Sequence, residues 1–160
     1  MQNKILIFFL IIFNLVIFKV YSNEQITFDV SELEILDGGN KIIGKNRGNI
    51  TTDNGITIEA DTFEFNKSKN ILRAQGNINV KDELNNYNFS SENIFYFKNE
   101  ERIEIKGKSN ALIDRDYKFE IENVIILRDE MIISSDKGAT ILDMANLTPV
   151  SYTHLTLPTT

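Results

Sequence analysis

Apolar and polar residues alternate along most of this 160-residue chain, and the alternation has a period of two. Ile56 and Ile58 alternate with polar neighbours, and so do Phe63 and Phe65. A period of two is typical of β-strands with one buried face. Between residues 23 and 144 we find no convincing amphipathic pattern with the helical period. The pattern therefore predicts an all-β fold.

The strand pattern recurs roughly every thirty residues, which indicates an internal repeat. Four copies begin 30, 31 and 30 residues apart, at Ile26–Ile35, Ile56–Phe65, Tyr87–Tyr96 and Tyr117–Ile126. A polar turn and a second strand-like run follow the second and third copies, at Ile71–Val80 and Arg102–Lys108. The triplet Gly-Asn-Ile occurs at both 48–50 and 76–78. The last unit, around Gly138, does not align with the others.

The alternation shifts at the same place in three copies. The shift falls at Asp61, Glu92 and Glu122, where one extra residue separates two alternating runs. An extra residue is typical of a β-bulge or a corner. We therefore expect antiparallel strands that bend around a common core. The residues alone leave a sandwich, a jelly roll and a short open β-solenoid as alternatives.

Residues 1–22 are predicted to be a secretory signal peptide. Lys4 precedes the apolar run 5–18, and Val20 and Ser22 suit the −3 and −1 positions of a signal peptidase site. The run is shorter than the ~20 apolar residues that span a membrane. A retained N-terminal anchor is the alternative. With either, the rest of the chain is expected to cross the inner membrane.

Residues 149–160 differ from the body of the chain. They contain both prolines, the single histidine and no formal charge. We interpret this segment as a non-native tail, with a short disordered C-terminus as the alternative. The expected organisation is a signal peptide at 1–22, one β-domain at 23–148 and this tail.

Composition excludes several kinds of site. The chain has no cysteine and one histidine, His154, so a disulfide framework, a thiolate metal site and a multi-histidine metal cluster are excluded. The formal charge is −6 overall, and −8 over residues 23–148, which hold 15 basic and 23 acidic residues. This balance argues against binding of nucleic acid. We expect no metal, no cofactor and no catalytic residue.

The repeat resembles a known family. The segment 58–78 reads as a strand with a central acidic residue, a Phe-Glu-Phe run, a polar turn, and a strand with Gly-Asn-Ile. It resembles the OstA-like periplasmic domain of lipopolysaccharide transport proteins, which is found in LptA and in the N-terminal part of LptD. The resemblance covers residues 26–143. It does not distinguish an LptA from the N-terminal domain of an LptD.

The resemblance implies a twisted β-jelly roll, V-shaped in section, whose apolar interior holds the acyl chains of lipopolysaccharide. It implies a periplasmic location, or the periplasmic part of an outer-membrane protein. Such domains stack through edge strands, and 26–36 and the last unit are the candidate edges. The implied partners are lipopolysaccharide, other OstA-like domains and, for LptD, the outer-membrane assembly machinery.

The candidate lipid-binding residues are apolar positions that the repeat places in the interior. They are Phe28, Val30, Ile58, Phe63, Phe65, Phe89, Ile94, Tyr96, Phe119, Ile121 and Ile126. A sealed core in a structural or adhesive exported domain is the alternative account of the same residues. Phe95, Phe97, Ile125 and Leu127 fall on the opposite face. Either a partner, a barrel outside this sequence or the rest of the fold covers them, or they pack across strands within the sheet.

An enzyme acting on carbohydrate is the third hypothesis, because glycosidases use paired carboxylates. The candidates are the acidic residues at the bends, Asp61, Glu92 and Glu122. A residue that recurs in every unit is more economically explained by structure than by catalysis. We therefore expect these carboxylates to stabilise turns or face solvent, and we expect no enzymatic activity.

Overall fold

The structure is a computed structural model that describes residues 26–113, 117–130, 132–144, 148–152 and 155–158. These residues form twelve β-strands in one antiparallel sheet, with short 3-10 turns at Asp37–Gly39 (η1) and Lys98–Glu100 (η2). The strands are β1 (Ile26–Leu36), β2 (Lys41–Thr52), β3 (Ile56–Ala60), β4 (Thr62–Asn66), β5 (Ile71–Asp82), β6 (Tyr87–Phe97), β7 (Arg102–Ile113), β8 (Tyr117–Leu127), β9 (Ile132–Ser135), β10 (Ala139–Asp143), β11 (Thr148–Tyr152) and β12 (Leu155–Pro158). Among the described residues, no helix has the length and apolar character needed to span a membrane. The predicted all-β fold is confirmed.

The sheet follows the order of the chain. Its main path is β1-β2-β3-β5-β6-β7-β8-β10-β11. β4 lies between β2 and β5, β9 pairs with β8, and β12 pairs with β9. Within the described residues β1 pairs only with β2, so the segment predicted as an edge does form one edge of the sheet.

Most strands bend at the positions where the sequence pattern shifts. Asp61 separates β3 from β4. The register between β5 and β6 shifts between Gln75 and Ile78, and similar shifts occur where β6 meets β7 and β7 meets β8. Gly76 and Gly107 have positive φ angles at these bends, which glycine adopts without steric cost. The predicted corners at Asp61, Glu92 and Glu122 therefore coincide with bends in the sheet.

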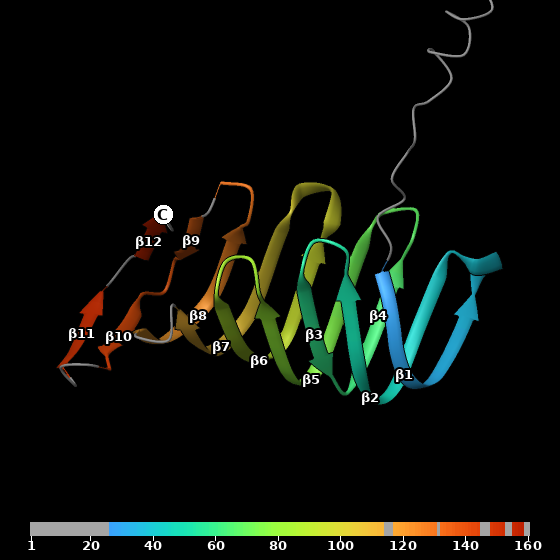
Figure 1. Cartoon of the computed structure of the whole chain (residues 1–160), viewed down its shortest axis with the longest axis horizontal. Coiled ribbons are helices and arrows are strands. Elements are labelled where there is room, and N and C mark those ends of the chain that lie inside the picture. The colour runs from blue at the N-terminus through green and yellow to red at the C-terminus, as the bar shows by residue number, and fades with distance from the viewer. Residues whose placement is uncertain (1–25, 114–116, 131, 145–147, 153–154, 159–160) are drawn as a thin grey trace, which may run out of the picture.

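The bends fold the sheet into two arms that enclose one apolar core. The β3 arm consists of β3, β10, β11 and segments 26–30, 48–52, 78–82, 87–91, 108–113 and 117–122. The β4 arm consists of β4, β9, β12 and segments 32–36, 41–44, 71–75, 94–97, 102–105 and 124–127. Figure 1 shows the bends of the first strands along the lower edge and the turns between strands along the upper edge. The turns of the β3 arm and those of the β4 arm form two rows that face each other, and we call the border between these rows the mouth.

The two ends of the chain carry predictions that stay untested. The predicted signal peptide at 1–22 lies outside the described residues. Residues 148–152 and 155–158 form β11 and β12 in this structure. Their pairing does not test whether 149–160 is native, so that interpretation stays a prediction.

Gly48 allows β1 to lie close to β2. A Cβ atom at Gly48 would be 2.4 Å from the backbone oxygen of Asp29 and 2.8 Å from the Cα of Val30. Backbone atoms cannot rotate away, so the strand itself would have to move. A Cβ atom at Gly44, on the same strand, would meet side-chain atoms, the nearest being Cγ1 of Val30 at 3.0 Å.

We expect Gly48→Ala to separate the first half of β1 from β2 and to lower the free energy of unfolding by about 1–3 kcal/mol, the usual cost of overpacking. Hydrogen exchange should show faster exchange of the β1 amides in this variant. Gly44→Ala is the matched control and should have a smaller effect, because side chains can adjust. Unchanged exchange in β1 of Gly48→Ala would show that the close approach is not needed.

Candidate functional site

The inner face of the β3 arm carries an unbroken row of apolar side chains. The residues of this row are in direct register across eight strands, namely Phe28, Ile50, Ile58, Val80, Phe89, Ala111, Phe119 and Ile141. Neighbouring strands lie ~4.8 Å apart, so eight positions extend over roughly 34 Å. The row forms because side chains alternate between the two faces of a strand.

The inner face of the β4 arm carries a second row. Its members in direct register are Ile35, Ile42, Phe65, Leu72, Tyr96, Ile103, Ile126 and Ile133. The two rows meet inside the fold, where the rings of Phe28 and Phe65 lie 6.2 Å apart between centroids. Together they form a continuous apolar interior that runs along the length of the sheet.

The structure places all eleven candidate residues in this interior. Nine of them are buried, and Phe28 and Val30 are partly buried against the core. Their contact with lipid stays a prediction. The side chains fill the interior in this structure. The largest of them, Tyr96, Phe63 and Phe89, are at most 2% exposed. Binding of a guest molecule therefore requires the arms to separate.

Several interior residues, on the second strands of the first three units, are not among the candidates predicted from the sequence. Ile42, Ile50, Leu72, Val80 and Ile103 are all buried. These runs also alternate, but the offset of their parity from that of the preceding strand depends on the turn between them. The positions opposite the predicted residues could be found only once the register was known.

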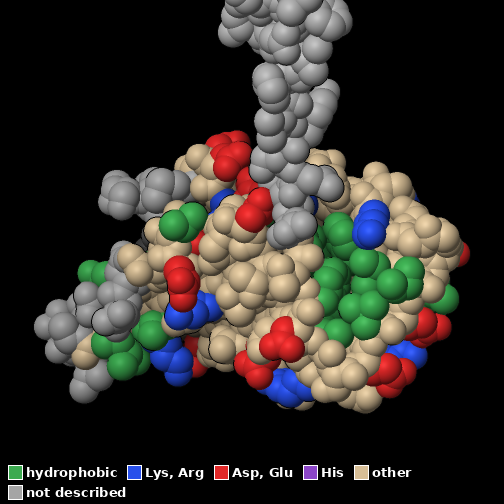
Figure 2. Space-filling view, turned by 45° about the vertical axis from the view of Figure 1, so that its right-hand side comes forward, with side chains coloured by type: hydrophobic (Ala, Val, Ile, Leu, Met, Phe, Trp, Pro, Cys, Tyr) green, Lys and Arg blue, Asp and Glu red, His purple; other side chains and the backbone are tan. Residues whose placement is uncertain are grey.

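The interior is open to solvent at the β1 end. Leu33 and Ile35, which face the interior from β1, are 44% and 61% exposed, because no described strand lies beyond them. Figure 2 shows a hydrophobic patch on this side of the molecule. Exposed apolar surface at an unpaired strand edge is typical of a docking site.

The acidic residues at the bends contact neighbouring strands rather than one another. Asp61 lies 2.9 Å from the guanidinium of Arg47 and accepts a hydrogen bond from the side chain of Asn77 at 2.7 Å. Glu92 accepts a hydrogen bond from the backbone N–H of Asn77 at 3.3 Å. These contacts support the structural role that we expected for the bends.

The outward-facing aromatic residues pack against neighbouring strands. The rings of Phe95 and Phe97 stack with centroids 6.5 Å apart, and the guanidinium groups of Arg73 and Arg102 lie 5.4 and 3.9 Å from their respective centroids. Such cation–π contacts cover the ring faces. Among the explanations for these aromatic residues, the structure favours cross-strand packing, although Ile125 beside them is 38% exposed.

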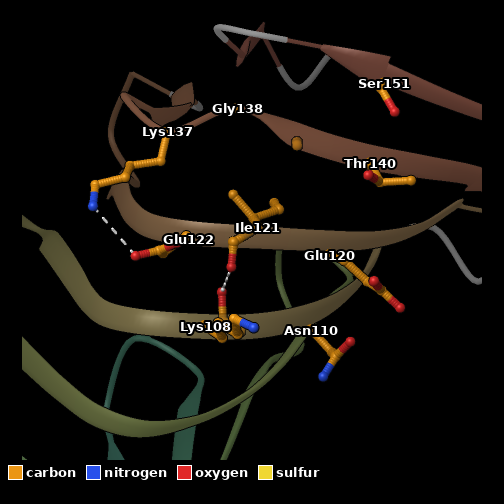
Figure 3. Close-up of a pocket in the computed structure, with 11 residues that line it drawn as sticks. Lys108, Asn110, Glu120, Ile121, Glu122, Lys137, Gly138, Thr140 and Ser151 are labelled. Carbon is orange, nitrogen blue, oxygen red and sulfur yellow. Dashed lines mark hydrogen bonds and ion pairs between the residues drawn. The ribbon is translucent and has the colours of Figure 1, made fainter.

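An open pocket of about 520 Å³ lies over β7, β8 and β10 (Figure 3), and the buried side chain of Ile121 forms part of its lining. Two glutamates, Glu120 and Glu122, line it, but Glu122 forms an ion pair with Lys137 at 3.4 Å. The other acidic residues at the bends, Asp61 and Glu92, do not line this pocket. In the described part of the chain, no group of three metal-ligating side chains is close enough to hold an ion.

Five polar side chains from both arms, three of them buried and two partly buried, form a cluster at the mouth. We call it the mouth cluster, and it consists of Asn54, Asp82, Tyr96, Glu101 and Arg128. Arg128 is central: it donates through Nε to Asp82 at 2.7 Å, through Nη2 to the backbone oxygen of Asn54 at 3.0 Å, and through Nη1 to Glu101. The side chains of Arg128 and Asp82 are only 6% and 2% exposed. None of these contacts was predicted from the sequence.

The charges of the mouth cluster keep Asp82 ionised. Burial favours the neutral acid, but hydrogen bonds from Arg128 and Asn85, together with the charge of Arg128, hold the pKa of Asp82 below its usual value of 3.8. Burial raises the pKa of Tyr96, and the carboxylate of Glu101 raises it further, so the Tyr96 hydroxyl stays protonated and donates a hydrogen bond to Glu101 at 2.9 Å.

The lowered pKa of Asp82 predicts a loss of stability in acid. A group whose pKa is lower in the folded state contributes stability above its unfolded pKa, and that contribution disappears as the pH falls through the folded value. The free energy of unfolding should therefore decline below about pH 4. Urea denaturation from neutral to acid pH would measure the decline, and Asp82→Asn should make the curve shallower. If the free energy of unfolding of Asp82→Asn declined with pH as steeply as that of the wild type, Asp82 would not be the cause of the acid sensitivity.

The fold and the interior define a class of protein: a bent antiparallel jelly roll with one continuous apolar interior between two arms. No family model matches the sequence. No curated protein matches it either. Among solved structures, the chain is similar to LptH from Pseudomonas aeruginosa, described as the LptA-homologous periplasmic component of the conserved lipopolysaccharide transport device. The TM-score is 0.63 at 13% identity, over 70% of this chain and 82% of LptH. The fold predicted from the OstA-like resemblance is confirmed.

Proposed function

We propose that this chain is a periplasmic lipopolysaccharide-binding component that passes lipopolysaccharide toward the outer membrane. The observation that carries the proposal is the pair of apolar rows that face each other across the interior of an LptH-like fold. Acyl chains gain about 0.8 kcal/mol for each methylene group removed from water. An apolar interior that runs across eight strands offers a continuous surface for such chains.

Transfer out of such a site requires a destination of similar affinity. The same methylene groups that favour binding also oppose release. If the next protein offers an equivalent apolar interior, the two states have nearly equal free energy, and the cargo can move between them. A series of similar domains would therefore transport the lipid where a single tight binder would retain it.

The β1 edge supports stacking with a second OstA-like domain. A strand added beside β1 would satisfy its unpaired backbone groups. It would also cover Leu33 and Ile35 and extend the inner row that begins at Ile35. This applies equally to an LptA and to the N-terminal domain of an LptD, for which the outer-membrane assembly machinery would be the final partner.

Co-elution with purified lipopolysaccharide tests this function. The chain without its predicted signal peptide should co-elute with lipopolysaccharide on size-exclusion chromatography. If the co-eluting lipopolysaccharide is labelled, an excess of unlabelled intact lipopolysaccharide should displace it. The delipidated polysaccharide should not displace it, because the acyl chains supply the binding energy. Competition by the polysaccharide alone would place the binding site outside the apolar interior.

A structural or adhesive domain with a sealed core is the second candidate. The filled interior of this structure favours it, because no acyl chain fits there until the arms move apart. This candidate predicts a stably folded protein that shows no co-elution at any lipid concentration.

A further inference from the structure

The mouth cluster joins the two rows of turns that border the interior. Asn54 lies in the turn between β2 and β3, and Asp82 ends β5, so both belong to the β3 arm. Tyr96 lies on β6 within the β4 arm, and Glu101 and Arg128 lie in turns that follow strands of the same arm. Every contact between these two groups therefore crosses the mouth.

Four hydrogen bonds make this crossing. Two are donated by Arg128, to the carboxylate of Asp82 at 2.7 Å and to the backbone oxygen of Asn54 at 3.0 Å. The other two are donated by the side-chain amide of Asn54, to the hydroxyl of Tyr96 at 2.9 Å and to the carboxylate of Glu101 at 2.7 Å. In the described residues, no buried side-chain nitrogen or oxygen lacks a partner. The cluster is thus complete only when the arms are together.

The cluster differs from the contact between the arms near β1. There the arms meet through apolar rings such as Phe28 and Phe65. Apolar contacts are non-directional and can be replaced by contacts with an acyl chain. A buried ion pair requires a specific geometry, and an acyl chain cannot replace it. The arms can therefore exchange apolar contacts for lipid near β1, but not at the mouth cluster.

We propose that the mouth cluster is the gate of the interior, which must open before lipid is bound. This rests on the proposed function. A lipid with a large polar headgroup cannot bury that headgroup among apolar side chains. The headgroup must project through the mouth while the acyl chains lie inside. Entry from the side and movement along the interior both require the crossing hydrogen bonds to break.

A covalent lock across the mouth tests this inference. The chain contains no cysteine, so Asn54→Cys with Glu101→Cys introduces the only two thiols. A short bifunctional thiol reagent joins the two arms, and the same protein without reagent has a weakened cluster. The control pair is Asn70→Cys with Asn99→Cys, whose side chains are also hydrogen-bonded, at 2.8 Å, but which both lie on the β4 arm.

Binding of fluorescently labelled lipopolysaccharide should separate the outcomes. Apparent affinity falls in proportion to the fraction of molecules that can open, so the lock at 54 and 101 should weaken binding by at least about tenfold. The unreacted double variant should bind lipopolysaccharide at least as tightly as the wild type. The control lock at 70 and 99 should leave the apparent affinity unchanged.

Two failures are distinguishable. If the protein locked at 54 and 101 binds as well as the unreacted protein, the gate is wrong while lipid binding stands. If the wild type and the unreacted variant both fail to bind, the proposed function itself is wrong.

Discussion

Replacing Arg128 with alanine should lower the free energy of unfolding by about 3–5 kcal/mol. The guanidinium of Arg128 forms ion pairs with two carboxylates, those of Asp82 and Glu101, in a place where water is largely excluded. Without it, one negative charge is left buried beside another. Removal of one partner of a buried ion pair leaves an uncompensated charge, which costs far more than the pair itself contributes. Urea denaturation monitored by circular dichroism would measure the change.

Arg47 provides the matched control for this variant. It also contacts two carboxylates, those of Glu59 and Asp61, but its side chain is 45% exposed. Exposed ion pairs contribute about 0–1 kcal/mol because water screens them. Arg47→Ala should therefore cost far less than Arg128→Ala. Equal losses in the two variants would mean that burial of the mouth cluster has no energetic consequence.

Replacing Phe89 with alanine should lower the free energy of unfolding by about 3–5 kcal/mol, since it removes a large buried ring and leaves a cavity. Phe89 is 1% exposed and lies between Val80 and Ala111 in the inner row of the β3 arm. Its ring also packs edge-on against Tyr87, with centroids 5.9 Å apart. The small side chain of Ala111 cannot fill the space that the ring leaves.

The control for Phe89 is its exposed neighbour Asn88, whose side chain faces outward. Asn88→Ala should change the free energy of unfolding by less than about 0.5 kcal/mol, as is usual for surface positions. A similar cost for both variants would contradict the alternation on which the interior assignment depends. Chemical denaturation of the two proteins at the same pH decides the question.

The strands, the bends and most of the interior could be predicted because they follow from local rules. Ile56, Ile58, Phe63 and Phe65 show the alternation directly, and the shift at Asp61 identifies the bend between them. Each of these signals lies within ten residues of sequence. The edge position of β1 also followed from its place at the start of the repeat.

The mouth cluster could not be predicted in the same way, because its members are far apart in the sequence. Arg128 contacts Asp82 across 46 residues and Asn54 across 74. Neither of these separations along the sequence is a multiple of the repeat length. The contacts exist only because the two arms fold toward each other. A local pattern of polar residues gives no information about which turns meet across the mouth.

One signal in the repeat does point to Arg128. Lys67, Lys98 and Arg128 each follow the last strand residue of the β4 arm in their units. Their backbone N–H groups all donate to the preceding turn, at 2.8, 3.0 and 3.0 Å. A basic residue at this repeat position marks where successive turns join. The alignment of the repeats would have shown the position, but not the buried carboxylates that it meets.

The most direct test of the central claim, that the interior binds lipid, is photo-crosslinking in cells. A photoreactive amino acid placed at Phe89 or at Phe65 should form a covalent adduct with lipopolysaccharide, because both side chains face the interior. The same amino acid at the exposed neighbour Asn88 should give none. Adducts at 65 and 89 but not at 88 are the predicted result. A folded, exported protein that gives no adduct from either interior position would contradict the account.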